Sequence, residues 1–211
     1  MSVCYIVGAG DFETPFVPGS DDLVIAADGG LLHLKKYGIR ADLAIGDFDS
    51  LGHVPEECER IVFPEKKDFT DTALALAEGE RRGYREFIIL GGTGGRDDHT
   101  FANYSLLLEA KERGVFVKLV SKNSTAFVIR NEKASVKCDT GAHFSAFAFG
   151  RVANGVTIKG LAYEASGVSL SPSCHLASCN LFDGRTAEVE VRDGALLVFV
   201  EAPFAAVNFD K

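Results

Sequence analysis

Acidic side chains recur in the first third of the sequence, at turn-like positions close to apolar runs. They are Asp28, Asp47, Asp49, Asp68 and Asp71. Carboxylates that lie close together repel one another, and their desolvation costs free energy unless a cation or a proton neutralises them. Mg²⁺ accepts oxygen ligands and commonly binds one or two carboxylates together with substrate phosphates. The acids therefore suggest a magnesium site, and the alternative is a set of unrelated acids on solvated loops.

A glycine-rich segment follows the apolar run Phe87–Leu90 and precedes an expected helix. It reads Gly91-Gly92-Thr93-Gly94-Gly95-Arg96-Asp97-Asp98. Glycines allow backbone amides to approach a ligand closely, and the amides at a helix N-terminus suit a phosphate, to which Arg96 adds paired donors. The segment is not a Walker A loop, because the Lys-Ser/Thr ending is missing. By itself it could be a tight turn, but with the upstream acids it predicts a Mg-nucleotide site.

Strands and helices alternate in the first part of the chain, which implies a mostly parallel sheet with both faces covered. The expected strands are Val3–Val7, Leu23–Ala27, Leu43–Ile45, Ile61–Phe63, Phe87–Leu90 and Val115–Val120. The expected helices are Leu31–Tyr37, Thr70–Arg82 and Asp98–Arg113. Ligands of such sheets bind outside the carboxyl ends of the strands, where most of the acids and the glycine-rich segment fall. Gly8-Ala9-Gly10 lacks the third glycine of a dinucleotide fingerprint and is expected to form a turn or a nucleotide-adjacent loop.

The second part of the chain consists of short β-type runs separated by turn residues. They are Ala126–Arg130, Ser135–Cys138, His143–Phe149, Gly155–Ile158, Thr186–Val191 and Ala195–Glu201. Asp193-Gly194 is expected to join the last two runs as a hairpin. The predicted fold class is α/β, with an N-terminal, mostly parallel α/β sheet domain (residues 1–125) followed by a C-terminal antiparallel β-sandwich domain (residues 126–211).

Composition limits the classes of function. The 211 residues carry a formal net charge of −8 without a basic tract, which argues against nucleic-acid binding. No apolar run approaches the ~20 residues that span a bilayer, and no basic signal-peptide start is present, so we expect a cytoplasmic protein away from membranes. The five cysteines form no C-x-x-C pair, which favours free thiols over a zinc site or disulfides.

Four short motifs resemble, in order and spacing, the catalytic domain of the thiamine pyrophosphokinase family. They are Asp28-Gly29-Gly30, Gly46-Asp47-Phe48-Asp49-Ser50, Lys67-Asp68-x-Thr70-Asp71 and Gly91-Gly92-x-Gly94-Gly95-Arg96-x-Asp98-His99-x-x-x-Asn103. The resemblance implies an ATP:thiamine pyrophosphotransferase, which transfers a diphosphoryl group from ATP to the thiamine hydroxyl and releases AMP. It also implies a homodimer in which the β-rich domain of one chain completes the site of the other.

The resemblance assigns roles to residues of the first domain. Asp47, Asp49 and Asp71 are expected to bind Mg²⁺ and, with Arg96, to form the catalytic set. ATP and its phosphates are expected to contact Asp28, Lys67, Asp68, Thr70, Gly91, Gly92, Arg96 and Asp98. Asp98 and His99 could instead orient Arg96. The proton acceptor stays open, with Asp71 as one candidate.

The β-rich half resembles the family less closely, since Cys179 stands where the family favours the serine of a Ser-Asn pair. Ser178 and Asn180 are expected to hydrogen-bond the aminopyrimidine ring of thiamine, and Phe182 to supply an aromatic face. A polar turn between strands is the alternative. Two other functions remain open: a pyrophosphokinase for another heterocyclic alcohol, such as a hydroxymethyl-pterin, and a non-catalytic nucleotide or thiamine sensor.

Overall fold

The computed structural model describes residues 2–49, 52 and 55–209, so Ser50 of the acidic motif lies outside the described residues. The chain divides into two compact units. The first consists of residues 1–106 and 114–122, and the second of residues 107–113 and 123–211. The boundary expected between residues 125 and 126 falls within strand β7 (Thr125–Arg130), which belongs to the second unit.

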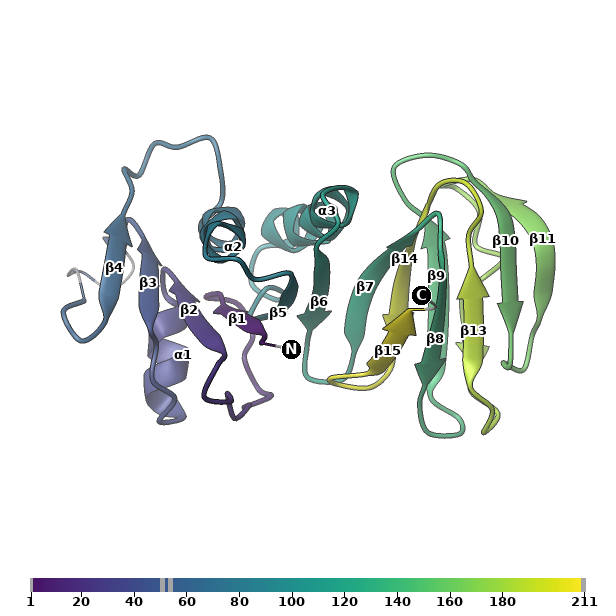
Figure 1. The fold of residues 1–211 in the computed structure, drawn as a ribbon, viewed down its shortest axis with the longest axis horizontal. Helices are drawn as coiled ribbons and strands as arrows, with labels where there is room; N and C mark the ends of the chain where they lie inside the picture. Colours follow the sequence, from purple (N-terminus) through teal and green to yellow (C-terminus); the bar gives the residue numbers. More distant parts are fainter. Residues whose placement is uncertain (1, 50–51, 53–54, 210–211) are drawn as a thin grey trace. The chain divides into compact units, whose positions relative to one another are not determined.

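Parallel strands form the sheet of the first unit (Figure 1). Their order across the described sheet is β4 (Glu59–Val62), β3 (Leu43–Gly46), β2 (Leu23–Ala27), β1 (Cys4–Val7), β5 (Glu86–Leu90) and β6 (Phe116–Val120). Every neighbouring pair is parallel, which confirms the expected α/β class. Strands β2, β3 and β4 follow one another from β1 to one edge of the sheet. The chain then returns to the other side of β1, where β5 and β6 extend the sheet in the opposite direction. The strand order therefore reverses between β1 and β5, the kind of position where such sheets bind ligands.

Helices cover the two faces of this sheet. Helix α1 (Gly30–Lys36) places Leu34 in the buried cluster that contains Val24 of β2. Helix α2 (Asp71–Arg81) packs on the other face, where Gly79 lies so close to Phe87 and Cys4 that a Cβ atom would collide with them. Helix α3 (Asp97–Glu112) follows β5. Because alternate strand residues face opposite sides, a sheet covered in this way has apolar residues along its whole strands, as in the fully buried β2.

Antiparallel strands form two sheets in the second unit. One has the order β12 (Asn180–Leu181), β9 (His143–Ala148), β14 (Ala195–Val200) and β7. The other has the order β11 (Ala165–Leu170), β10 (Ala153–Lys159), β13 (Ala187–Glu190), β8 (Lys133–Lys137) and β15 (Ala206–Phe209). Buried and more exposed residues alternate along β8, β9 and β13, so each sheet has one buried face. This pattern is that of a sandwich and confirms the expected class of the second half.

The hairpin expected at Asp193-Gly194 is wrong. Strand β13 pairs with β8 and β10, whereas β14 pairs with β7 and β9, so the turn carries the chain from one sheet to the other. The amide of Gly194 donates a 2.8 Å hydrogen bond to Oδ1 of Asn131, and its carbonyl accepts one of 3.2 Å from the Asn131 amide. An Asp-Gly turn can join two paired strands of a hairpin or two strands of different sheets. Which of these forms here depends on the partners with which β13 and β14 pair.

Candidate active site

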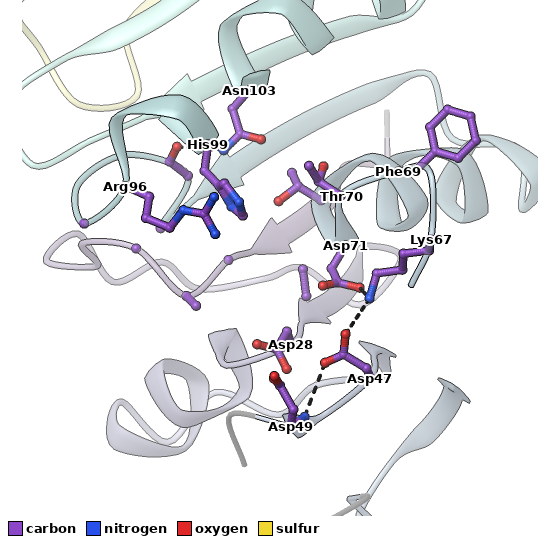
Figure 2. A pocket seen from close by; sticks show the side chains of 18 of the residues that line it. Asp28, Asp47, Asp49, Lys67, Phe69, Thr70, Asp71, Arg96, His99 and Asn103 are labelled. Carbon is purple, nitrogen blue, oxygen red and sulfur yellow. Dashed lines mark hydrogen bonds and ion pairs between the residues drawn. The ribbon is translucent and has the colours of Figure 1, made fainter. Parts of the chain in front are cut away.

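A cavity of about 670 Å³ lies at the carboxyl ends of the parallel strands of the first unit (Figure 2). The loops that follow β1, β2, β3 and β5 line it, together with the segment before α2. The cavity brings together these residues predicted from the sequence: Asp28, Asp47, Asp49, Lys67, Asp68, Thr70, Asp71, Gly91, Gly92 and Arg96. Asp98 is absent from the described residues that line it.

Three carboxylates of the cavity converge. One carboxylate oxygen from each of Asp28, Asp47 and Asp49 lies within 4.8 Å of the others. Turns in the backbone produce this arrangement, because Asp28 and Phe48 adopt φ values of 47° and 59°, in the left-handed region that non-glycine residues seldom occupy. Phe48 is buried, and the Asp49 amide donates a 3.3 Å hydrogen bond to Oδ1 of Asp47. The β3 strand thus ends in a tight turn that presents two acids next to the acid that follows β2.

Lys67 joins two acids of the cavity. Its Nζ lies 2.8 Å from Oδ2 of Asp47 and 2.9 Å from Oδ1 of Asp71. The exposed fractions of the Lys67, Asp47 and Asp71 side chains are 13, 17 and 22%, so water screens these ion pairs less than it screens pairs on the surface. Burial alone would lower the pKa of Lys67, but its hydrogen bonds to Asp47 and Asp71 raise that pKa overall.

The two acids bonded to Lys67 titrate differently. The hydrogen bond from Lys67 lowers the pKa of Asp47. Burial raises the pKa of Asp71, and this effect, with the charges of Asp47 and Asp28, exceeds the opposing effect of Lys67. Asp71 therefore accepts a proton more readily than an ordinary aspartate does, which suits the proton acceptor considered from the sequence.

The start of helix α2 fixes Asp71 in place. Oγ1 of Thr70 accepts a 3.2 Å hydrogen bond from the Ala73 amide, so Thr70 caps the helix. Asp71 is the first helical residue, where the helix dipole favours a negative charge. The Thr70 hydroxyl thus has a structural role in this structure, and its contact with phosphate stays a prediction.

Two glycine-containing loops run side by side in the cavity. The Gly8 amide donates to the Leu90 carbonyl, and the Gly10 amide donates to the Gly91 carbonyl, both at 2.8 Å. A Cβ atom on Gly8, Gly10 or Gly91 would collide with the backbone of the opposite loop. Sequence reasoning left Gly8–Gly10 as a turn or a nucleotide-adjacent loop, because only the parallel pairing of β1 with β5 places it in the cavity.

Helix α3 anchors the second of these loops. Asn103 is 6% exposed, and its Nδ2 donates a 2.7 Å hydrogen bond to the Gly92 carbonyl. A Cβ atom on Gly92 would press on the Asn103 amide. Asn103 was part of the sequence motif but had no assigned role. Its buried contact shows that it holds the glycine-rich loop against the first half of α3.

Arg96 reaches the cavity from the N-terminus of α3. Its guanidinium donates two hydrogen bonds to Asp98, of 3.1 Å to Oδ1 and 2.6 Å to Oδ2. The hydrogen bond from Arg96 lowers the pKa of Asp98 to about 2. Asp98 thus orients Arg96, and its contact with phosphate stays a prediction. His99 also lines the cavity beside Arg96, although it was not assigned to the site (Figure 2).

The residues expected to contact thiamine belong to the second unit. Asn180 is 3% exposed, and its amide is used within the chain: Oδ1 accepts from the Tyr163 amide at 3.0 Å, and Nδ2 donates to the Tyr163 carbonyl at 2.6 Å. Phe182 is 1% exposed and packs edge-on against Phe144. Ser178 donates a 2.7 Å hydrogen bond to the His175 carbonyl. Asn180 and Phe182 therefore have structural roles here, and all three thiamine contacts stay predictions.

Comparisons with known proteins agree with the fold and the motifs. Residues 18–119 match the family model described as thiamin pyrophosphokinase, catalytic domain. A search among curated proteins gave no significant match. No helix in the described part of the chain has the length and apolar composition needed to cross a membrane.

Solved structures similar to this chain cover almost all of it. Thiamine pyrophosphokinase from Bacillus subtilis has 22% identity and a TM-score of 0.82 over 96% of this chain and 99% of that chain. A thiamin pyrophosphokinase family protein from Enterococcus faecalis has 26% identity and a TM-score of 0.83 over 95% and 99% of the two chains. The yeast enzyme has 16% identity and a TM-score of 0.72 over 95% and 86%. Residues 18–119 therefore match a catalytic domain of the thiamin pyrophosphokinase type, and the chain as a whole is similar in fold to thiamine pyrophosphokinases.

Proposed function

We propose that the protein transfers a diphosphoryl group from ATP to the hydroxyl of thiamine, giving thiamine diphosphate and AMP. The observation that carries the proposal is the composition of one cavity. Three convergent carboxylates and Lys67 lie at one part of it, and two apposed glycine loops with Arg96 lie at another. This arrangement suits a metal-bound polyphosphate, and the family match supplies the acceptor.

The donor set of the cavity fits Mg²⁺. Asp28, Asp47 and Asp49 offer hard carboxylate oxygens, close enough together to face one ion. Asp71 is a further acid of the cavity, and Lys67 bridges it to Asp47 of this group. A bound Mg²⁺ would neutralise the negative charge that develops on the phosphate oxygens. The sequence suggested Asp47, Asp49 and Asp71 as ligands, and the geometry leads us to propose Asp28 as well.

The other residues of the cavity position the phosphates. Backbone amides of the glycine loops can approach phosphate oxygens closely, because no side chain intervenes. Arg96, already oriented by Asp98, offers planar donors that match a phosphate. Lys67 supplies an ammonium held between Asp47 and Asp71. These groups hold the β-phosphorus in line with the attacking hydroxyl, which is the main requirement of phosphoryl transfer.

The proposed reaction balances without a covalent enzyme intermediate. The hydroxyl oxygen of thiamine forms a bond to the β-phosphorus, and the bond from that phosphorus to the α,β-bridging oxygen breaks. The bridging oxygen leaves on AMP, and the hydroxyl proton passes to a base. Asp71 suits this role because burial raises its pKa, which brings it closer to the pKa of an effective acceptor.

The proposal includes a homodimer in the cytoplasm, with the β-rich unit providing the thiamine pocket. In the segment expected to contact thiamine, Cys179 is exposed and Ser178 is half-buried. Sedimentation at several protein concentrations would measure the oligomeric state. A monomer at all concentrations with full activity would contradict a shared site.

One experiment tests the proposed reaction. The protein is incubated with Mg²⁺, ATP labelled in its β- and γ-phosphates, and a panel of alcohols that includes thiamine and a hydroxymethyl-pterin. We expect both labels in the thiamine product and one AMP for each product molecule. Formation of ADP with thiamine monophosphate would overturn the diphosphoryl transfer. A product only from the pterin would overturn the acceptor, and no product from any alcohol would favour a sensor.

A further inference from the structure

Phe69 differs from every other side chain that lines the cavity. Among the described lining residues it is the only large apolar one, and the others are acids, bases, polar residues, glycines and alanines. Its side chain is 63% exposed. An apolar ring left in water forgoes the free energy that its burial would contribute, so its place in a charged ligand cavity suggests a ligand that covers it.

Single exposed apolar residues are common on protein surfaces, and exposure alone carries no argument. Phe101 on α3 makes this clear, because it is 64% exposed but does not belong to the described lining of the cavity. Position distinguishes Phe69. It lies in the loop between Lys67, which is bonded to two acids, and Thr70, which caps α2. The ring is therefore presented by a short segment that is anchored on both sides.

The side chains of this loop diverge. Figure 2 shows Lys67 directed toward Asp47 and Asp71, while the ring of Phe69 lies at the outer edge of the labelled group, away from the carboxylates. A nucleoside triphosphate has the same two-part character, since it joins a charged polyphosphate to a flat aromatic base. The acids, Lys67 and the glycine loops account for the polyphosphate, and Phe69 is the large apolar side chain among the described lining residues that the base can cover.

We propose that Phe69 binds the aromatic base of the nucleotide by stacking at the outer edge of the cavity. The inference rests on the proposed function, which places the phosphates of ATP against the acids and glycine loops. Every nucleotide base has a flat aromatic face that can stack on a phenyl ring. Stacking therefore requires no hydrogen-bonding group next to Phe69. The site should therefore accept ATP and GTP with similar affinity.

The test compares Mg-ATP with inorganic tripolyphosphate, which lacks the whole nucleoside, and includes thiamine as a third ligand. Calorimetry measures the binding of Mg-ATP, of inorganic tripolyphosphate with Mg²⁺, and of thiamine to the wild-type protein, Phe69→Ala and Phe101→Ala. Phe69→Ala should weaken Mg-ATP binding about 5-fold or more, the lower end of what stacking on a base contributes. Tripolyphosphate and thiamine should bind as to wild type. Phe101→Ala, the equally exposed control, should bind all three as wild type does.

Several results would overturn the inference. Equal weakening of ATP and tripolyphosphate would mean that the loop, and not the base contact, has changed. A loss of thiamine affinity alone would assign the ring to the acceptor, and unchanged ATP binding would remove Phe69 from the site. If the wild-type protein bound neither ATP nor tripolyphosphate, the proposed function itself would fail, and this result is distinct from the others.

Discussion

Nζ of Lys67 lies 2.8 Å from Oδ2 of Asp47, in a part of the cavity where both side chains are largely shielded from water. Asp47 is also one of the three acids whose oxygens converge within 4.8 Å. The Asp47 carboxylate therefore forms an ion pair with Lys67 and also belongs to the candidate metal site. A divalent ion that binds Asp47 must compete with the Lys67 ammonium, because two cations on one carboxylate repel each other.

This competition gives the first prediction. Lys67→Met removes the competing cation, so the nucleotide-free protein should bind Mg²⁺ more tightly, by about 3- to 10-fold, the scale of a partly screened ion pair. Affinity for Mg-ATP should change in the opposite direction, because the phosphate contact that we propose for Lys67 is lost. Calorimetric titration with Mg²⁺ alone measures the first effect. Lys66→Met, the neighbouring exposed lysine, controls for the change in net charge. Weaker Mg²⁺ binding by Lys67→Met would refute the competition.

The second prediction concerns the acid that the geometry adds to the metal site. Asp28→Asn keeps the shape of the side chain but removes one of three converging charges. We expect weaker binding of Mn²⁺, measured by electron paramagnetic resonance, and a fall in diphosphoryl transfer of at least ~10²-fold. Asp21→Asn, an exposed acid just before the opposite end of β2, is the matched control. Wild-type Mn²⁺ affinity in Asp28→Asn would exclude this residue from the ligand set.

Asp71→Asn provides a third prediction, because Asp71 is bonded to Lys67 and is not one of the three converging acids. If Asp71 accepts the hydroxyl proton or completes the metal site in the ATP complex, transfer should fall by at least ~10²-fold at saturating Mg²⁺. The fold should survive, as a melting curve can verify. Turnover near that of the wild type would leave Asp71 with a purely structural role at the start of α2.

The fourth prediction tests the anchor of the glycine-rich loop. Asn103→Ala leaves the buried Gly92 carbonyl without its side-chain donor, and the free energy of unfolding should fall by about 1–3 kcal/mol. The loop should also lose its fixed position, so the KM for ATP should rise. Urea unfolding and steady-state kinetics measure the two effects. Ser105→Ala, on the exposed side of the same helix, should change neither.

The fifth prediction separates structural from thiamine-binding roles in the second unit. Phe182→Ala should lower the free energy of unfolding by about 3–5 kcal/mol, since it removes a fully buried aromatic ring. Asn180→Ala should cost about 1–3 kcal/mol, because it removes the buried partner of the Tyr163 backbone. Chemical unfolding measures both. A raised thiamine KM with unchanged stability would instead restore the ligand contacts suggested by the resemblance.

Much of the fold of the first unit could be predicted, because its local sequence patterns favour the same helices and strands that the tertiary structure contains. The strand ending at Leu90, the helix capped by Thr70 and the helix starting near Asp97 were all visible as apolar periodicity and capping residues. The second unit was harder. Strands β11, β12 and β15 were not expected, since β12 has two residues and β11 and β15 are mostly exposed or half-buried. Such strands depend on pairing with distant neighbours and carry little local signal.

The sequence by itself determined which chemical groups this protein can bring to a phosphate and a metal. The types and order of Asp47, Lys67, Asp71 and Arg96 already predicted a Mg-nucleotide site. Only the tertiary structure decided how those groups pair: Asp28 with Asp47 and Asp49, Lys67 between Asp47 and Asp71, and Gly8–Gly10 against the second glycine loop. It likewise turned Asn180 and Phe182 inward. The physical reason is that residue type sets what a side chain can bind, whereas strand order and burial set which partners lie within reach.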